Sequence, residues 1–188
     1  MPRARSRRSV LVALPALVAM VKPASAFLPQ TGRRLPDPRD PATTLEAVEA
    51  AIARLLPVPE VTPAALAARL AAPGAAPVLF DVRSEEEFAL GRIAGATRLD
   101  PGLSAAAILK AHGGRIAGAD VVVYCSVGWR SGLLLERAAR RLAAARPASV
   151  ANLRGGLFRW RAEGLPVEGD VHPFDAAWGA LLARTLGG

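Results

Sequence analysis

The sequence predicts an α/β fold, a doubly wound parallel sheet of about five strands with helices on both faces. Two short apolar runs, residues 78–82 and 121–124, are typical of strands buried on both sides of a parallel sheet. Segments with apolar residues at helical spacing separate these runs from the other strand candidates. Because strands and helices alternate, neighbouring strands are expected to be parallel and joined by helical crossovers.

Caps and turn residues set the boundaries of the other elements. Residues 27–43 are rich in Pro, Arg and Asp, which predicts a linker. Thr44 and Thr62 each precede a helical pattern as N-caps, and Ser84 and Glu87 have the spacing of a capping box. The predicted strands cover residues 60–61, 78–82, 96–99, 121–124 and 149–153. The predicted helices cover residues 45–56, 63–72, 85–90, 105–114, 131–146, 157–162 and 174–186.

Composition and charge narrow the classes of function. Of the 188 residues, 52% are hydrophobic and 21% are charged, which excludes a chain that is disordered throughout. Five of the 24 basic residues lie in the first 26 positions, which hold no acidic residue, so the other 19 stand against 16 acidic ones. This small excess of basic over acidic residues outside the first 26 positions is not enough for a nucleic-acid-binding surface, and no nucleic acid partner is expected. With one cysteine and two histidines, we expect no disulfide, no metal and no other cofactor.

The first 26 residues have the pattern of an export signal. A basic start precedes an apolar run over residues 9–21 and an A-x-A motif at residues 24–26, which predicts cleavage before Phe27. The run is shorter than the about 20 residues of a membrane-spanning helix, so no stable membrane insertion is expected after cleavage. Retention as an anchor stays open, as does the choice between the Sec and twin-arginine routes. We expect a bacterial protein that is periplasmic or secreted.

The segment that carries chemistry is the loop of residues 125–130, which follows the strand at 121–124. Ligands of open α/β sheets bind at the carboxyl ends of strands, where curled loops form anion-binding nests of N–H groups. Gly128 permits the backbone angles of such a loop, and Arg130 adds a positive charge. Cys125 at the start of this loop is therefore predicted to be a reactive thiolate, not an inert buried thiol.

Four ordered segments carry a family resemblance. They are the loop at 125–131, D-V-R followed by E-F at 81–88, G-R-I-A-G-A at 91–96, and L-R-G-G with a later W and G-L-P-V at 153–167. Together they resemble the rhodanese family of single-domain sulfurtransferases over about residues 61–167. Arg92 and Ala94 stand where this family has His and Pro, on a turn outside the loop.

The resemblance implies a sulfurtransferase without a cofactor. Cys125 would attack the outer sulfur of a small anionic donor such as thiosulfate and hold it as a persulfide, which a thiol or, in assays, cyanide then removes. The loop N–H groups would stabilise the anionic sulfur, Arg130 would dock the donor, and Trp129 would wall the pocket. Ser131 would donate a hydrogen bond toward the sulfur. The substrate-binding residues are thus Ser126, Val127, Gly128, Trp129, Arg130 and Ser131.

Other side chains are assigned structural roles. Asp81 and Arg83 are expected to support loops at the edge of the sheet by hydrogen bonds and charge pairing. Trp160 and Trp178 are expected to be packing residues. The predicted organisation is a signal peptide at 1–26, a linker and helix at 27–58, a rhodanese domain at 59–168 and a helical tail at 169–188.

Two other functions stay open. One is a rhodanese-like module that binds sulfur or docks on a periplasmic protein without turnover, for which the segments flanking the domain leave room. The other, less favoured, is a Cys-dependent phosphatase or arsenate reductase. The loop from Cys125 to Arg130 has six residues, one fewer than in the phosphatase-like relatives, which suits sulfur better than a tetrahedral oxyanion.

Overall fold

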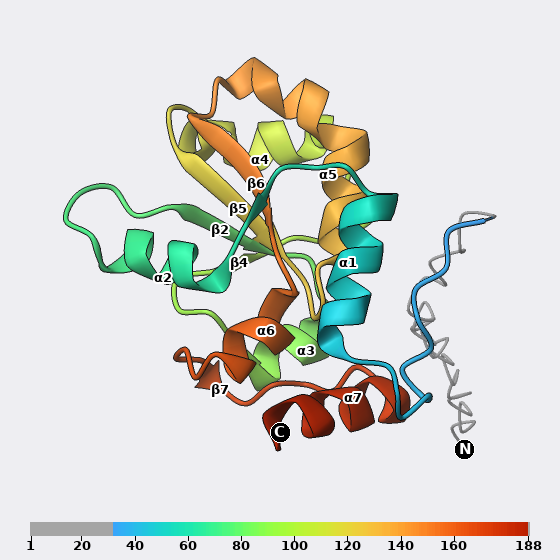
Figure 1. Cartoon of the computed structure of the whole chain (residues 1–188). Helices are drawn as coiled ribbons and strands as arrows, with labels where there is room; N and C mark the ends of the chain where they lie inside the picture. The colour runs from blue at the N-terminus through green and yellow to red at the C-terminus, as the bar shows by residue number, and fades with distance from the viewer. Residues whose placement is uncertain (1–31, 188) are drawn as a thin grey trace, which may run out of the picture.

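The computed structural model, described here for residues 32–187, contains a five-stranded sheet in which every pairing is parallel (Figure 1). The strand order is β1-β6-β5-β2-β4, which confirms the predicted parallel sheet. The strands are β1 (Glu60–Val61), β2 (Val78–Asp81), β4 (Thr97–Arg98), β5 (Asp120–Tyr124) and β6 (Ser149–Leu153). A separate antiparallel pair joins β3 (Gly91–Arg92) to β7 (Glu168–Gly169).

Seven α-helices lie within residues 32–187, and their caps follow the sequence closely. They are α1 (Leu45–Leu55), α2 (Pro63–Ala71), α3 (Glu85–Leu90), α4 (Ala105–Ile116), α5 (Trp129–Leu142), α6 (Gly156–Ala162) and α7 (Ala176–Leu186). The side chains of Thr44 and Thr62 accept N-cap hydrogen bonds, and Ser84 with Glu87 forms the capping box.

Several helix ends differ from the prediction, among them the end of α5, which stops at Leu142 before a 3-10 turn over Ala143–Ala145 and not at residue 146. Helix α4 does not stop at Gly113 and Gly114 but continues to Ile116, which is buried in the core. Burial of this side chain contributes about 2 kcal/mol, which offsets the helix-forming penalty of about 1 kcal/mol for each glycine. Helix α5 begins at Trp129, earlier than predicted, because Gly128 in the left-handed conformation forms its N-cap.

The sheet separates two apolar cores, as the predicted helices on both faces require. Side chains of β5 alternate between them, with Val122 and Tyr124 on one face and Val121 and Val123 on the other. Helices α1, α2 and α6 pack on the first face, whereas α4 and most of α5 pack on the second (Figure 1). The loop at residues 125–128 thus follows a central strand whose backbone is fixed from both sides.

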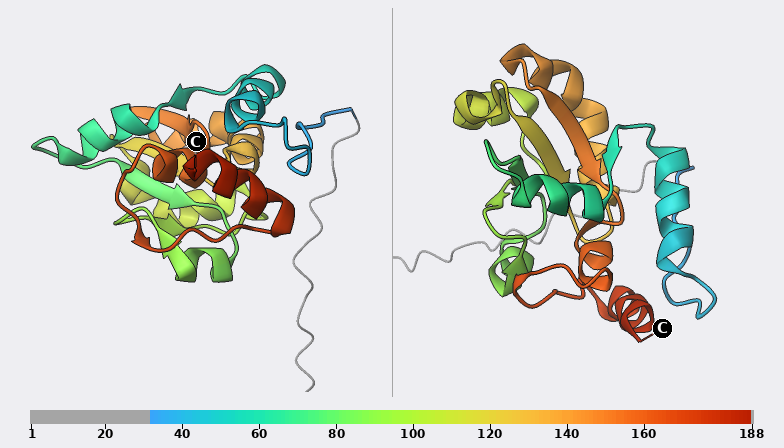
Figure 2. Two further views of the ribbon diagram at one scale, coloured as in Figure 1. Left: turned by 60° about the horizontal axis from the view of Figure 1, so that its bottom comes forward. Right: turned by 60° about the vertical axis from the view of Figure 1, so that its left-hand side comes forward.

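The segments before β1 and after β7 lie against the same end of the molecule. The arm of residues 32–44 runs beside α7, where Arg184 donates hydrogen bonds to the main-chain carbonyls of Pro38, Asp40 and Thr43. Helix α7 also contacts α1 and α6 (Figures 1 and 2). The predicted export signal at residues 1–26 lies outside the described residues. Within residues 32–187, no helix is both long and apolar enough to cross a membrane.

Candidate active site

Cys125 lies where the central strand β5 ends, and its side chain is 1% exposed. The backbone N–H of Gly128 donates to its Sγ atom over 3.2 Å. Gly128 makes this contact because its φ of 93° turns the chain back toward the sulfur, a conformation that favours glycine. The sulfur is therefore held at the N-terminus of α5, where partial positive charge stabilises an anion.

The loop is held from outside by the start of α6. The N–H groups of Leu157 and Phe158 donate to the carbonyls of Cys125 and Ser126, each over 2.9 Å. Gly156 has φ of 55°, and a Cβ atom there would overlap the carbonyl oxygen of Cys125. This close approach explains the second glycine of the L-R-G-G segment, since it lets the α6 N-terminus reach the loop carbonyls, whereas the first, Gly155, is the left-handed N-cap of α6.

Glu87 is the site residue that sequence reasoning missed. Its carboxylate, 2% exposed, accepts two hydrogen bonds of 2.7 Å from Arg130 and one of 3.0 Å from the Ser126 hydroxyl. Burial by itself would raise the pKa of the Glu87 carboxyl, yet the hydrogen bonds and charge of Arg130 lower it to about 2. In the sequence, Glu87 belongs to the capping box and to the E-F part of the segment at 81–88, and neither pattern gave a reason to place its carboxylate beside the loop.

Arg130 is consequently less available to bind an anionic donor than expected. Its guanidinium forms the bidentate pair with Glu87 and also donates to Ser126 Oγ over 2.9 Å. The ring of Phe174 lies 4.9 Å from its central carbon. The role of Arg130 in docking an anionic donor therefore stays a prediction, and the charge that it would offer is balanced by Glu87.

Ser131 points away from the sulfur and toward the β6 side chain Asn152. Its hydroxyl donates to Asn152 Oδ1 over 2.7 Å, and Asn152 Nδ2 donates to the Gly128 carbonyl over 3.0 Å. The expected hydrogen bond from Ser131 to sulfur is absent among the described contacts. Ser131 instead supports the loop through the buried amide of Asn152.

Asp81 and Arg83 lie at the carboxyl end of β2, fully buried. Their side chains pair with an Nη2–Oδ2 distance of 2.6 Å, and Arg83 also donates to the carbonyl of Gly91. These contacts tie the end of β2 to β3, as expected of supporting residues.

A cavity of about 180 Å³ opens at the loop, and distant segments line it. The lining residues are Leu35, Cys125, Ser126, Val127, Trp129, Arg130, Phe174 and Trp178. Trp129, to which the resemblance assigns a place in the pocket wall, is one of these lining residues. Leu35 from the arm, with Phe174 and Trp178 from the C-terminal segment, was not anticipated, and Trp178 is more than the packing residue expected.

Comparison with known proteins identifies the family. A family model described as a rhodanese-like domain matches residues 62–163. This chain belongs to the rhodanese-like family. A search of curated proteins found no match.

Several solved structures are similar to this chain. A thiosulfate sulfurtransferase from Pseudomonas aeruginosa is 21% identical with a TM-score of 0.51, over 75% of this chain and 26% of that one. A rhodanese-like domain of the Anabaena sp. Alr3790 protein is 25% identical, with a TM-score of 0.47, over 60% and 80% of the two chains. A rhodanese-related protein from Thermoplasma volcanium is 21% identical, with a TM-score of 0.45, over 60% and 99%.

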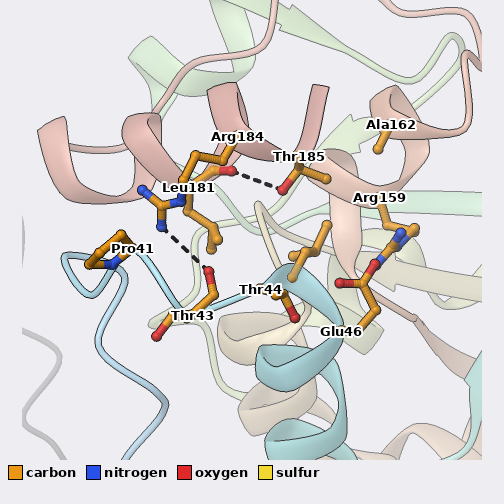
Figure 3. Close-up of a pocket in the computed structure, with 10 residues that line it drawn as sticks. Pro41, Thr43, Thr44, Glu46, Arg159, Ala162, Leu181, Arg184 and Thr185 are labelled. Carbon is orange, nitrogen blue, oxygen red and sulfur yellow. Dashed lines mark hydrogen bonds and ion pairs between the residues drawn. The ribbon is translucent and has the colours of Figure 1, made fainter. Parts of the chain in front are cut away.

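A second cavity of about 320 Å³ lies apart from the rhodanese-like loop, between the arm, α1, α6 and α7 (Figure 3). It shares no lining residue with the Cys125 cavity. Arg159, on its wall, pairs with Glu46 and Glu49, and Arg184 faces the main-chain carbonyl of Thr43. Arg159 thus joins α6 to α1, whereas Arg184 joins the C-terminal helix α7 to the arm. Within residues 32–187, no group of three or more His, Cys, Asp or Glu side chains is arranged to hold a metal ion.

Proposed function

We propose that this rhodanese-like protein is an exported sulfurtransferase that moves sulfane sulfur through a persulfide on Cys125. The observation that supports it best is the hydrogen bond of 3.2 Å from the Gly128 N–H to Sγ of Cys125, a residue that lines the cavity at the loop. A nucleophilic sulfur needs its anionic form, and an N–H donor at a helix N-terminus favours that form.

The reaction has two displacement steps. The Cys125 thiolate attacks the outer sulfur of a donor such as thiosulfate; the S–S bond of the donor breaks and sulfite leaves with the electron pair. A thiolate acceptor, or cyanide in assays, then attacks the outer sulfur of the persulfide, and the Cys125 thiolate is released. Each step places negative charge on sulfur at the same position, where the N–H groups of the loop stabilise it.

Glu87 and Arg130 act in this proposal as positioning residues. Their ion pair holds the hydroxyl of Ser126, so the first turn of the loop keeps one shape while the charge on the sulfur changes. On the other side of the loop, the Asn152 side chain donates a hydrogen bond to the carbonyl of Gly128. This contact fixes the peptide between Gly128 and Trp129 and so sets the direction of the Trp129 N–H bond.

The proposed location is the bacterial periplasm or the outside of the cell, because residues 1–26 have the pattern of an export signal. The proposed partners are a small anionic sulfur donor and a thiol acceptor, with a periplasmic protein thiol as an additional acceptor. Mass spectrometry of the protein recovered from a bacterial periplasm should find Phe27 at the N-terminus, and recovery from the cytoplasm alone would contradict export.

Intact mass measurement tests the chemistry. After incubation with excess thiosulfate, the protein should gain about 32 Da, and cyanide should remove this mass with release of thiocyanate. Cys125→Ser should gain nothing. A stable adduct that no thiol removes would favour the module without turnover. Hydrolysis of phosphoryl substrates without any sulfur adduct would favour the phosphatase reading instead.

A further inference from the structure

We propose that the acceptor thiol carries an apolar substituent, which packs on the aromatic wall of the Cys125 cavity. The aromatic wall consists of Trp129, Phe174 and Trp178. This inference rests on the proposed function and adds to it the chemical class of the acceptor. The attacking sulfur of the acceptor would lie beside the loop N–H groups, while its apolar substituent would pack on the aromatic rings.

The aromatic wall is built from two separate parts of the chain. Trp129 begins α5 directly after the loop, whereas Phe174 comes from the segment that leads into α7 and Trp178 from the first turn of α7. Leu35 and Val127 complete an apolar lining around the sulfur. The cavity is therefore apolar on every side except the loop backbone, the Ser126 hydroxyl and Arg130, and apolar surface of this kind favours an apolar ligand.

Charge in the cavity argues against a hydrophilic, charged acceptor. Among residues 32–187, Arg130 is the only basic side chain that lines it, and the two hydrogen bonds of 2.7 Å to Glu87 balance its charge. The Phe174 ring covers the guanidinium at 4.9 Å. A carboxylate or ammonium group on the acceptor would lose its hydration here without gaining an unpaired counter-charge.

The aromatic wall is held in place before any ligand binds. Phe174 adopts φ of 70°, which is unfavourable for a residue with a side chain, and its N–H donates to His172 Nδ1 over 3.0 Å. The carboxylate of Asp175 accepts from the Trp178 N–H over 2.9 Å and so caps α7. These contacts fix the backbone that carries the two rings, which reduces the ordering that binding would require.

The sulfur transfer balances without another reactant. The thiolate R–S⁻ attacks the outer sulfur of the Cys125 persulfide, the bond between the two persulfide sulfurs breaks, and the electron pair stays on Cys125. The product is R–S–S⁻. The apolar group R takes no part in bond changes, so its contribution appears as tighter binding of the transition state.

A series of thiols that differ only in methylene groups tests the inference. The protein loaded with sulfur from thiosulfate is mixed with ethanethiol, propane-1-thiol or butane-1-thiol, and the second-order rate of persulfide loss is measured. We expect a rise of about fourfold for each added methylene, as burial of a CH₂ group predicts. Equal rates for the three thiols would overturn the inference and leave the sulfurtransferase proposal intact.

A second series does not depend on sulfur loading. Ethyl, propyl and butyl methanethiosulfonates transfer R–S to the free thiol of Cys125, and their rates should rise by the same factor with chain length. If thiosulfate fails to load the protein, this series still decides whether the cavity selects apolar groups. A flat series here would also overturn the inference.

Variants of α7 test whether Trp178 causes the increase in rate with each added methylene. Trp178→Ala should lose most of the increase per methylene in both series, and Trp178→Phe should keep most of it. Leu186→Ala is the matched control, because Leu186 lies on the same helix, is 48% exposed and does not line the cavity. A Trp178→Ala protein that folds and keeps the full increase per methylene would contradict the proposed contact.

Discussion

Glu87 and Arg130, 43 positions apart in the sequence, form a bidentate ion pair with both hydrogen bonds at 2.7 Å beside the Cys125 loop. The pair couples the capping box of α3 to the first turn of α5. The carboxylate therefore has two structural tasks, since it also accepts the backbone N–H of Ser84 over 2.9 Å. Loss of this one carboxylate should disturb both the helix start and the loop.

Glu87→Gln should lower the free energy of unfolding by about 3 kcal/mol, because it leaves a largely buried guanidinium without its counter-charge. Urea unfolding of the variant and the parent protein measures the difference. The control is Glu136→Gln, which breaks the similar but more exposed pair with Arg33 (side chains 33% and 30% exposed) and should cost less than about 1 kcal/mol. Equal losses in the two variants would show that burial of the Glu87 pair adds nothing.

Acid should remove the same stabilisation. The folded-state pKa of Glu87, about 2, lies below its ordinary value of 4.5, so the carboxylate stabilises the folded protein above pH 4.5 and progressively less as the pH falls toward 2. The stability difference between the parent protein and Glu87→Gln should shrink by about 1 kcal/mol or more between pH 5 and pH 3. Unfolding curves at these two pH values check this, and a constant difference would be inconsistent with an ionised Glu87.

The thiol of Cys125 should react faster in the folded protein than in the unfolded chain at pH 6. The Gly128 N–H and the α5 N-terminus favour the thiolate, and we expect iodoacetamide to react about tenfold faster than with the protein in urea. Mass spectrometry over time gives both rates. Equal rates would mean that the loop does not activate the thiol.

Gly156→Ala should displace the loop. The added Cβ would overlap the carbonyl of Cys125 and lie 2.7 Å from the carbonyl carbon of Ser126, so the rate of sulfur loading should fall by at least about tenfold. Gly164→Ala is the matched control, because Gly164 has φ of +70° but nothing within 4 Å of a new Cβ. The control should lose about 1 kcal/mol of stability from backbone strain and keep its loading rate. Similar loading rates in the two variants would rule out the close approach as the cause.

Local patterns predicted the parts of this protein whose causes are local. The apolar runs of β2 and β5, the Thr44 and Thr62 caps and the glycine of the loop each act within a few residues, so the sequence shows them directly. The parallel sheet followed from the alternation of these elements, and the cysteine loop from its place after β5.

The missed features depend on contacts between distant segments. Glu87 meets Arg130, and Ser131 turns to Asn152, only because the sheet brings α3, α5 and β6 together. The aromatic ring of Trp178 reaches the cavity because α7 folds back on α6. Spacing within one segment holds no information about which of these side chains will meet.

The hydrogen bonds from Leu157 and Phe158 to the loop carbonyls also set an order of events during synthesis. The cysteine is made more than thirty positions before the residues that complete its surroundings. A nascent or truncated chain that ends before Gly156 contains the whole loop but lacks the donors that hold its carbonyls outward. Full reactivity of the thiol is thus a property of the finished domain, and the growing chain carries an ordinary cysteine until α6 is in place.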